Sequence, residues 1–242
     1  MSLATHSEQV RLSVAFESRS HARDSLISAP DLSHLPVVQE IVAKLGGPLL
    51  ELGRRARRVG PVDVGAVVLL AGCQEGAGCS TAAVACAAAA SVEWPTALVD
   101  ASFSNPQFKG RGLTQLLVGE GGRGWEEAVS RTAINQEVVH YLDSREALAF
   151  FPKSDNQGLR TAEFGSSHSD LAGWLGNLRQ EYGLVLIDAG SWDRGADQWA
   201  PWVDAALIVC DSKKTPAADW TNAWDRFEER GTHVLGIVET FV

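Results

Sequence analysis

The sequence predicts an α/β domain with a doubly wound, mainly parallel sheet and helices on both faces. Two observations predict this class. Short apolar runs bounded by turn residues recur along the chain, and helical segments stand between them. The runs are continuous rather than alternating, as expected of parallel strands that are buried on both sides. With 242 residues, 45% of them hydrophobic, the chain has enough apolar surface for one such domain.

The elements follow in a regular order. Residues 1–33 are polar without a lasting period and predict a flexible N-terminal tail, which leaves 34–242 as the folded domain. Residues 35–58 have helical apolar spacing, and the break at 46–48 (Gly-Gly-Pro) predicts two helices there. Strands are expected at 65–72, 96–100, 147–152, 184–188, 203–211 and 233–239. Further helices are expected at 80–91, 112–120, 125–131, 169–182 and 217–230.

Charge and cysteine usage exclude several classes of protein. The net charge of −9 argues against binding to nucleic acid or to an anionic membrane surface. The N-terminus lacks the apolar core of a secretory signal, and the apolar runs are too short or interrupted for membrane insertion. We therefore expect a cytoplasmic protein whose four cysteines are reduced thiols. Cys73 and Cys79 share one tight loop and form the pair that could oxidise together.

The segment "AGCQEGAGCSTAA" (71–83) predicts a phosphate-binding loop. Its glycines can aim successive backbone N–H groups inward, and the helix that follows adds its positive N-terminal end. The Ser80 hydroxyl stands where it could bind Mg²⁺. The predicted nucleotide-binding residues are Gly76, Ala77, Gly78, Cys79, Ser80 and Thr81. The alternative is a tight strand-to-helix turn with no ligand.

The loop departs twice from the usual consensus. Cys73 replaces the first glycine, and Cys79 replaces the lysine. The lysine would donate charge-assisted hydrogen bonds to phosphate, each worth roughly 1.5–3 kcal/mol. Its loss predicts weaker nucleotide binding and still weaker hydrolysis, because the lysine also stabilises charge in the transition state.

Two predicted strands end on an acid. Asp100 closes "ALVD" and Asp188 closes "LVLID". In a parallel sheet both lie at the carboxyl edge, beside the loop. There each could hold Mg²⁺ together with Ser80 or position an attacking water. The alternative for each is a strand-end carboxylate that caps nearby backbone.

The order and spacing of the loop, "LVDASFSNPQF", "YGLVLIDAG" and "VDAALIVCDSKKT" resemble the bacterial tyrosine kinases of capsule and exopolysaccharide synthesis. These kinases belong to the wider group of partition and septum-site P-loop ATPases. The resemblance covers about residues 48–242 and implies a P-loop NTPase fold with ATP and Mg²⁺ as cofactors. "ELGRRAR" matches the family's E-x-x-R-x-x-R helix through Glu51, Arg54 and Arg57, which implies an oligomer contact. Its alternative is a solvated basic helix end.

The departures from the family pattern fall on its chemistry, whereas the apolar positions are kept. The chain has Cys79 for the loop lysine, Gln74 for the second lysine of the partition ATPases, Ser102 for a second carboxylate, Ser104 for an arginine, and Glu239-Thr240 for the asparagine that reads adenine. Its tyrosines are Tyr141 and Tyr182, so the family's phosphorylated cluster is missing. We interpret Asp100 and Asp188 as vestigial or weak catalytic residues.

Three functions are compatible with these patterns. The leading hypothesis is a catalytically degenerate relative of the kinases that regulates or assembles polysaccharide synthesis or export. Its partner would be a membrane polysaccharide co-polymerase or adaptor, or an active paralogue, in a homo- or hetero-oligomer. The second is an active ATPase or tyrosine kinase that uses Lys213, Lys214 or a partner's lysine. The third is a partition-type positioning protein for another envelope machine.

Overall fold

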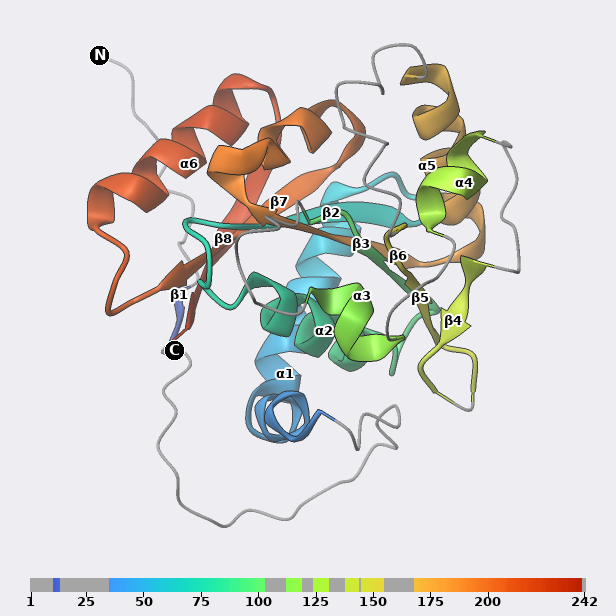
Figure 1. The fold of residues 1–242 in the computed structure, drawn as a ribbon, viewed down its shortest axis with the longest axis horizontal. Helices are drawn as coiled ribbons and strands as arrows, with labels where there is room; N and C mark the ends of the chain where they lie inside the picture. The colour runs from blue at the N-terminus through green and yellow to red at the C-terminus, as the bar shows by residue number, and fades with distance from the viewer. Residues whose placement is uncertain are drawn as a thin grey trace.

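A single sheet organises the part of the chain that is described. The computed structural model describes residues 11–13, 35–102, 112–118, 124–130, 138–143, 145–154 and 168–240. Within these residues the strand order is β1-β8-β7-β2-β6-β3-β5-β4 (Figure 1). The strands are β1 (Arg11–Ser13), β2 (Ala66–Gly72), β3 (Thr96–Asp100), β4 (His140–Tyr141), β5 (Leu148–Phe151), β6 (Leu184–Ser191), β7 (Ala205–Asp211) and β8 (His233–Thr240).

The connections confirm the predicted fold class. All neighbouring strands are parallel except β4 and β5, which are antiparallel. From β2 in the middle of the sheet the chain runs to one side through β3 and β5, returns through β6 between β2 and β3, and then builds the other side with β7 and β8. This is the doubly wound arrangement, in which ligands bind at the carboxyl ends of the strands.

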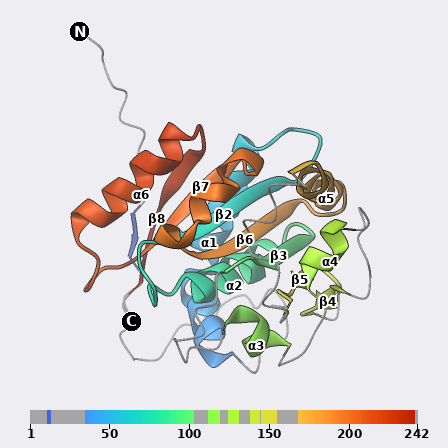
Figure 2. The ribbon, with the colours of Figure 1, turned by 45° about the horizontal axis from the view of Figure 1, so that its top comes forward.

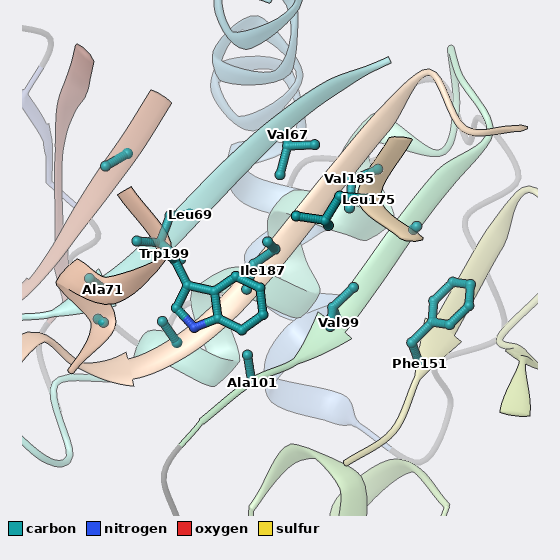
Figure 3. Packing of buried hydrophobic residues seen from close by; sticks show 14 of the residues in the cluster. Val67, Leu69, Ala71, Val99, Ala101, Phe151, Leu175, Val185, Ile187 and Trp199 are labelled. Atoms are coloured by element: carbon teal, nitrogen blue, oxygen red, sulfur yellow. The ribbon is translucent and has the colours of Figure 1, made fainter. Parts of the chain in front are cut away.

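The strands have continuous apolar sequences because both faces of the sheet are covered. β2 and β7 are buried at every position. Val68 and Leu70 point into one hydrophobic cluster, while Val67 and Leu69 point into another on the opposite face. Figure 3 shows the second cluster, with Trp199 over side chains of the central strands.

Helices form a layer on each face (Figures 1 and 2). One layer contains α1 (Pro36–Val59), α2 (Cys79–Ala90) and α3 (Leu113–Leu117). The other contains α4 (Trp125–Ser130), α5 (His168–Glu181), η3 (Trp192–Arg194), η4 (Ala196–Trp202) and α6 (Ala217–Glu229). α2 is rich in alanine and almost wholly buried, because small side chains let it lie close to both α1 and the sheet.

The prediction of two helices between residues 35 and 58 is wrong. The structure has one helix, α1, with Pro48 inside it. Proline lacks the N–H that would bond to the carbonyl one turn earlier, which normally breaks or kinks a helix. Here Leu49, Leu52 and Ala56 on the following turns are buried in the cluster with α2, and this packing keeps the helix continuous. Figure 1 shows α1 changing direction between its dark-blue start and its light-blue end.

The predicted N-terminal tail contains one described segment, β1. It is the edge strand of the sheet and pairs in parallel with β8, with Arg11 opposite Ile237 and Ser13 opposite Glu239. The other residues of the tail, 1–10 and 14–34, lie outside the described residues. Among the residues that are described, no helix has the length and apolar character needed to cross a bilayer.

Candidate functional site

The glycine-rich loop connects the end of β2 to the start of α2. Gly76 and Gly78 have φ angles of 77° and 84°, in the left-handed region that favours glycine. Gly78 is the N-cap of α2 and makes no side-chain cap, so the first N–H groups of the helix have no side-chain acceptor from the cap residue. The predicted residues 76–81 therefore span the end of the strand-to-helix loop and the first turn of α2.

Strand β8 holds this loop from one side. The Thr240 hydroxyl lies 2.6 Å from the carbonyl oxygen of Ala77 and 3.1 Å from that of Cys210. A Cβ on Gly78 would approach the Thr240 methyl group to 3.2 Å. Gly78 is thus required both by its backbone angle and by its neighbour. Thr240 stands at the position for which the resemblance implies an adenine-reading asparagine, and here it braces the loop.

The two strand-end carboxylates lie side by side, as the sequence predicted for a shared edge. Asp100 and Asp188 are direct register partners between β3 and β6. Both are buried, Asp100 at 2% exposure and Asp188 at 0%. Ionising two neighbouring buried carboxyl groups costs free energy unless hydrogen bonds or a cation compensate for their charges.

Asp100 is compensated by the protein itself. Its Oδ1 accepts the N–H (3.1 Å) and hydroxyl (2.6 Å) of Ser102. Its Oδ2 accepts the N–H (2.9 Å) and hydroxyl (2.7 Å) of Thr114 at the start of α3. Asp100 therefore ties the segment after β3 to α3, in agreement with the backbone-capping alternative. Ser102, the position for which the resemblance implies a second carboxylate, is one of its donors.

Asp188 is only partly compensated. Its Oδ1 accepts the Gly190 N–H at 3.1 Å, whereas the buried Oδ2 has no hydrogen-bond partner of normal geometry among the described residues. Burial raises the pKa of the Asp188 carboxyl to about 6, and the charge of Asp100 adds to the rise. The nearby Ser80 hydroxyl acts in the opposite direction on this pKa. Asp188 is thus a carboxylate with spare acceptor capacity beside the start of α2.

Cys79 lies against this carboxylate in place of the loop lysine. The side chain is 7% exposed and belongs to the cluster formed with α1 and α2. Burial raises the pKa of the Cys79 thiol well above its usual value, and the charge of Asp188 raises it further. The thiol therefore stays neutral and supplies no positive charge for a phosphate.

Sequence reasoning missed a lysine at the same edge. Lys153 follows β5 by two residues, and its Nζ donates to the Ser102 carbonyl oxygen at 2.6 Å. Its backbone N–H donates to the Thr114 hydroxyl at 2.8 Å. Glu126 lies nearby and accepts the Ser154 N–H at 3.0 Å; burial raises its pKa, while the charge of Lys153 lowers it. The available signal was a lysine directly after a buried strand, at the carboxyl edge.

The lysines that the sequence did single out follow β7. Lys214 Nζ lies 3.0 Å from Oδ2 of the buried Asp211, and this hydrogen bond holds the pKa of Asp211 below its usual value. Lys213 donates its backbone N–H to the other oxygen of Asp211 at 3.0 Å. Lys214 is thus engaged in an ion pair within the turn that follows β7.

The predicted oligomer helix lies at the other end of the molecule, where α1 leads into β2. Arg54 forms an ion pair with Glu93, just beyond α2, and lies 3.6 Å from Glu51. Arg57 donates to the Val64 carbonyl oxygen at 2.5 Å. Both arginines have partners within this chain, so an intersubunit role would require them to be shared or exchanged.

The residues at the loop fit a magnesium ion better than a triphosphate. A buried, incompletely bonded Asp188 oxygen beside a serine hydroxyl is the kind of oxygen donor set that Mg²⁺ or its waters use. The neutral Cys79 thiol does not fit the charge of a β- or γ-phosphate. No group of three or more metal-ligating His, Cys, Asp or Glu residues occurs in the described part of the chain.

Comparisons with known proteins place the fold. No protein-family model matches the chain, and no curated protein matches it significantly. The kinase domain of VpsO superposes with a TM-score of 0.66 over 87% of this chain and 97% of that domain, at 19% identity. The kinase domain of the Escherichia coli tyrosine kinase ETK gives 0.61 over 73% and 68%, at 16% identity.

A second group of similar structures consists of ATPases. The ATP complex of a Cyanothece McdA variant gives a TM-score of 0.57 over 72% of this chain and 70% of that one, at 17% identity. The expected resemblance to tyrosine kinase domains and partition-type ATPases is therefore confirmed at the level of structure. At these identities the likeness shows the shared fold: this chain is structurally similar to bacterial tyrosine kinase domains and to McdA-type ATPases.

Proposed function

We propose that this protein is a catalytically degenerate relative of the exopolysaccharide tyrosine kinases that acts as a regulatory or assembly partner in polysaccharide synthesis or export. It would work in the cytoplasm, at the membrane through a partner such as a polysaccharide co-polymerase, an adaptor or an active paralogue. The observation that carries the proposal is the buried, neutral Cys79 thiol against Asp188. A kinase of this fold needs a cation there, and the thiol cannot supply one.

Two further observations support the loss of phosphoryl transfer. The Asp100 oxygens are occupied by Ser102 and Thr114, so Asp100 can reach a metal only by giving up hydrogen bonds. Thr240 is bonded to the loop itself. Hydrogen bonds within the chain therefore hold the loop and Asp100 in place without catalysis.

Titration with ATP and Mg²⁺ tests the loss of activity. We expect millimolar affinity or no binding by calorimetry, no hydrolysis above background, and no tyrosine phosphorylation. Asp188→Asn serves as the matched variant, because it removes the candidate metal ligand and keeps the side-chain shape. Micromolar binding, with turnover that Asp188→Asn abolishes, would contradict the proposal.

A second candidate function, an active nucleotide enzyme with an atypical loop, is favoured by one observation. Lys153 brings a positive charge to Ser102, next to the carboxylate pair, without belonging to the loop. In this candidate Lys153 takes over charge that the family places at residue 79. Lys153→Met would then abolish ATP binding, and Lys213→Met would leave it unchanged. Equal binding by both variants, each folded by circular dichroism, would reject the candidate.

Assembly is tested at the helix of Glu51, Arg54 and Arg57. If this helix is an oligomer contact, reversal of Arg54 and Arg57 to glutamate reduces self-association or association with an active relative. The fold should survive, because the Arg54 pair is exposed and such pairs contribute about 0–1 kcal/mol. Light scattering on both proteins, and co-purification with the relative, measure the effect. An unchanged size and unchanged association would remove the contact from the proposal.

A further inference from the structure

Two cysteines that are far apart in the sequence meet beneath the loop. Cys73 follows the last residue of β2, and Cys210 lies in β7. Their Sγ atoms are 2.6 Å apart. Both side chains are buried, at 5% and 3% exposure. The closeness is unlike an ordinary contact between two thiols, whose sulfur atoms would stay farther apart.

The sheet register explains how the pair arises. Gly72 of β2 is the partner of Val209 of β7, and the Cys73 N–H continues the ladder by donating to the Val209 carbonyl oxygen at 2.8 Å. Cys73 and Cys210 are the next residues along these two strands. Neighbouring strands lie about 4.8 Å apart, within the range of about 4.4–6.8 Å between the Cα atoms of a disulfide.

The four cysteines divide between the two faces of the sheet. Cys73 and Cys210 belong to the hydrophobic cluster with α5 and α6, whereas Cys79 and Cys86 belong to the cluster with α1 and α2. The sequence pointed to Cys73 and Cys79 as the pair able to oxidise, because they share a loop. Cys73 directly follows β2 and Cys79 begins α2, and their side chains lie in different clusters.

We propose that Cys73 and Cys210 are a covalent modification site, at which a disulfide fastens the first residue of the glycine-rich loop to β7. The co-reactant is a low-molecular-weight disulfide of the glutathione class. One cysteine attacks it as the thiolate and releases one small thiol, which leaves a mixed disulfide. The other cysteine then displaces the second small thiol. Two protein thiols and one small disulfide become one protein disulfide and two small thiols, and the two protons end on the released thiols.

The proposal gives a role to a departure from the loop consensus. Cys73 stands where a phosphate-binding loop has its first glycine, and this position makes the crosslink possible. β8, the strand that pairs with β7, also contacts the loop. Its last residue, Thr240, has its hydroxyl near the carbonyl oxygens of both Ala77 and Cys210. The oxidised form would therefore hold the loop at its start as well as at its middle.

Burial sets the rate at which the bond forms. The contact with Cys210 and burial raise the pKa of the Cys73 thiol, so thiolate is scarce in the folded protein. Exchange should be slow and limited by opening of the region between the loop and β7. The thiol–disulfide exchange must therefore be allowed to reach equilibrium, because a brief exposure to oxidant would be too short.

Equilibration in glutathione buffers tests the inference. The full chain is brought to equilibrium from two directions: by incubating the folded, reduced protein, and by refolding the reduced, denatured protein in the same buffers. After acid quenching and alkylation we expect an intact mass lower by about 2 Da than the reduced form, for two hydrogen atoms lost. Non-reducing peptide mapping should give one crosslink, between Cys73 and Cys210.

Matched variants make the result specific. Cys73→Ala and Cys210→Ala should abolish both the mass change and the crosslink, and Cys86→Ala, a buried cysteine on the other face, should keep them. The oxidised wild type should melt several degrees higher than the reduced form, a shift that Cys73→Ala lacks. A crosslink between Cys73 and Cys79, glutathione adducts alone, or four free thiols from both directions would each overturn the proposal.

Discussion

Charged side chains at the amino ends and at the carboxyl ends of the strands, here called the amino edge and the carboxyl edge, are bonded in opposite ways. At the amino edge, Arg179 and Asp204 form a double ion pair, with Nη1–Oδ2 at 2.6 Å and Nη2–Oδ1 at 3.1 Å. Asp204 also accepts the Val67 N–H, and Arg179 donates to the Gly65 carbonyl oxygen. At the carboxyl edge, Asp188 keeps an oxygen without a well-formed hydrogen bond and has a raised pKa.

This difference separates structure from function within one fold. A polar group that only stabilises a fold tends to be fully bonded, because an unmet buried group costs free energy. The amino edge follows this rule and joins α5, β2 and β7. Among the described residues at the carboxyl edge, Asp188 beside the glycine-rich loop and Thr215 after β7 each keep a buried oxygen without a well-formed hydrogen bond. Asp188 is the one of these groups that is a carboxylate beside the glycine-rich loop, and the proposed metal site rests on it.

The largest effect is expected from breaking the amino edge. Asp204→Ala leaves the Arg179 guanidinium without its counter-charge and the Val67 N–H without its acceptor. Breaking a fully buried pair costs roughly 3–5 kcal/mol; this pair is partly buried, at 17% and 16% exposure, so the free energy of unfolding in urea should fall by about 3 kcal/mol. Glu40→Ala, which breaks an exposed pair with Lys44 on α1, is the control and should change it by less than about 1 kcal/mol. Equal losses in the two variants would contradict the comparison.

At the carboxyl edge, removal of the charge should stabilise the protein. The pKa of Asp188 is about 6 in the folded protein, above its unfolded value, so the folded state holds the proton more tightly. This contribution to stability is complete below pH 4 and is lost as the pH rises through 6. At pH 7 the loss is on the order of 2–3 kcal/mol.

Asp188→Asn tests this sign, because it removes the titration and leaves other groups in place. The difference in unfolding free energy between the variant and the wild type should grow in favour of the variant from pH 4 to pH 7. Denaturant unfolding at several pH values measures it. A difference that is constant with pH, or that grows in favour of the wild type, would show that Asp188 does not carry an unfavourable buried charge.

Introducing a cation beside Asp188 should increase the affinity of the carboxyl edge for Mg-ATP. Cys79→Lys places an ammonium group beside Asp188 and at the start of α2, where it can bond both the carboxylate and a phosphate. With roughly 1.5–3 kcal/mol for a charge-assisted hydrogen bond, Mg-ATP affinity should rise by about one to two powers of ten. Hydrolysis should stay at background, since Ser102 supplies no second carboxylate.

Cys79→Met is the matched control for that variant, because it has a side chain of comparable length without charge. Calorimetry should find no gain for methionine. If the lysine variant folds and binds no better than the methionine variant, the loop does not accommodate the phosphates of a nucleotide. Cys79 is then a packed core thiol, and the protein a scaffold without a nucleotide-bound state.

The smallest effect is expected at the brace between β8 and the loop. Thr240→Val keeps the shape of the side chain and removes the hydroxyl near the Ala77 and Cys210 carbonyl oxygens. The loss of one hydrogen bond should lower the free energy of unfolding by about 1 kcal/mol and speed amide exchange in residues 76–79. Exchange that is unchanged in the loop would show that Thr240 does not restrain it.

The sequence alone determined the class of fold and which residues meet in the candidate site. Continuous apolar strands can be buried only between two layers of helices, and the carboxyl ends of parallel strands share one edge. This local information was enough to bring residues 76–81, Asp100 and Asp188 together before any contact was known. The glycine pattern likewise indicated a loop whose backbone depends on glycine, and Gly76 and Gly78 have left-handed angles there.

Only the tertiary structure decided what each of these residues does. Pro48 is a breaker by local rules, yet burial of the following turns against α2 keeps α1 whole. Asp100 and Asp188 look alike in sequence, but α3 supplies Thr114 to one of them and no equivalent donor to the other. Cys73 meets Cys210 through the register of strands that are 137 residues apart. In each case the deciding neighbour comes from a distant part of the chain, and its side chain is positioned by packing rather than by the local pattern.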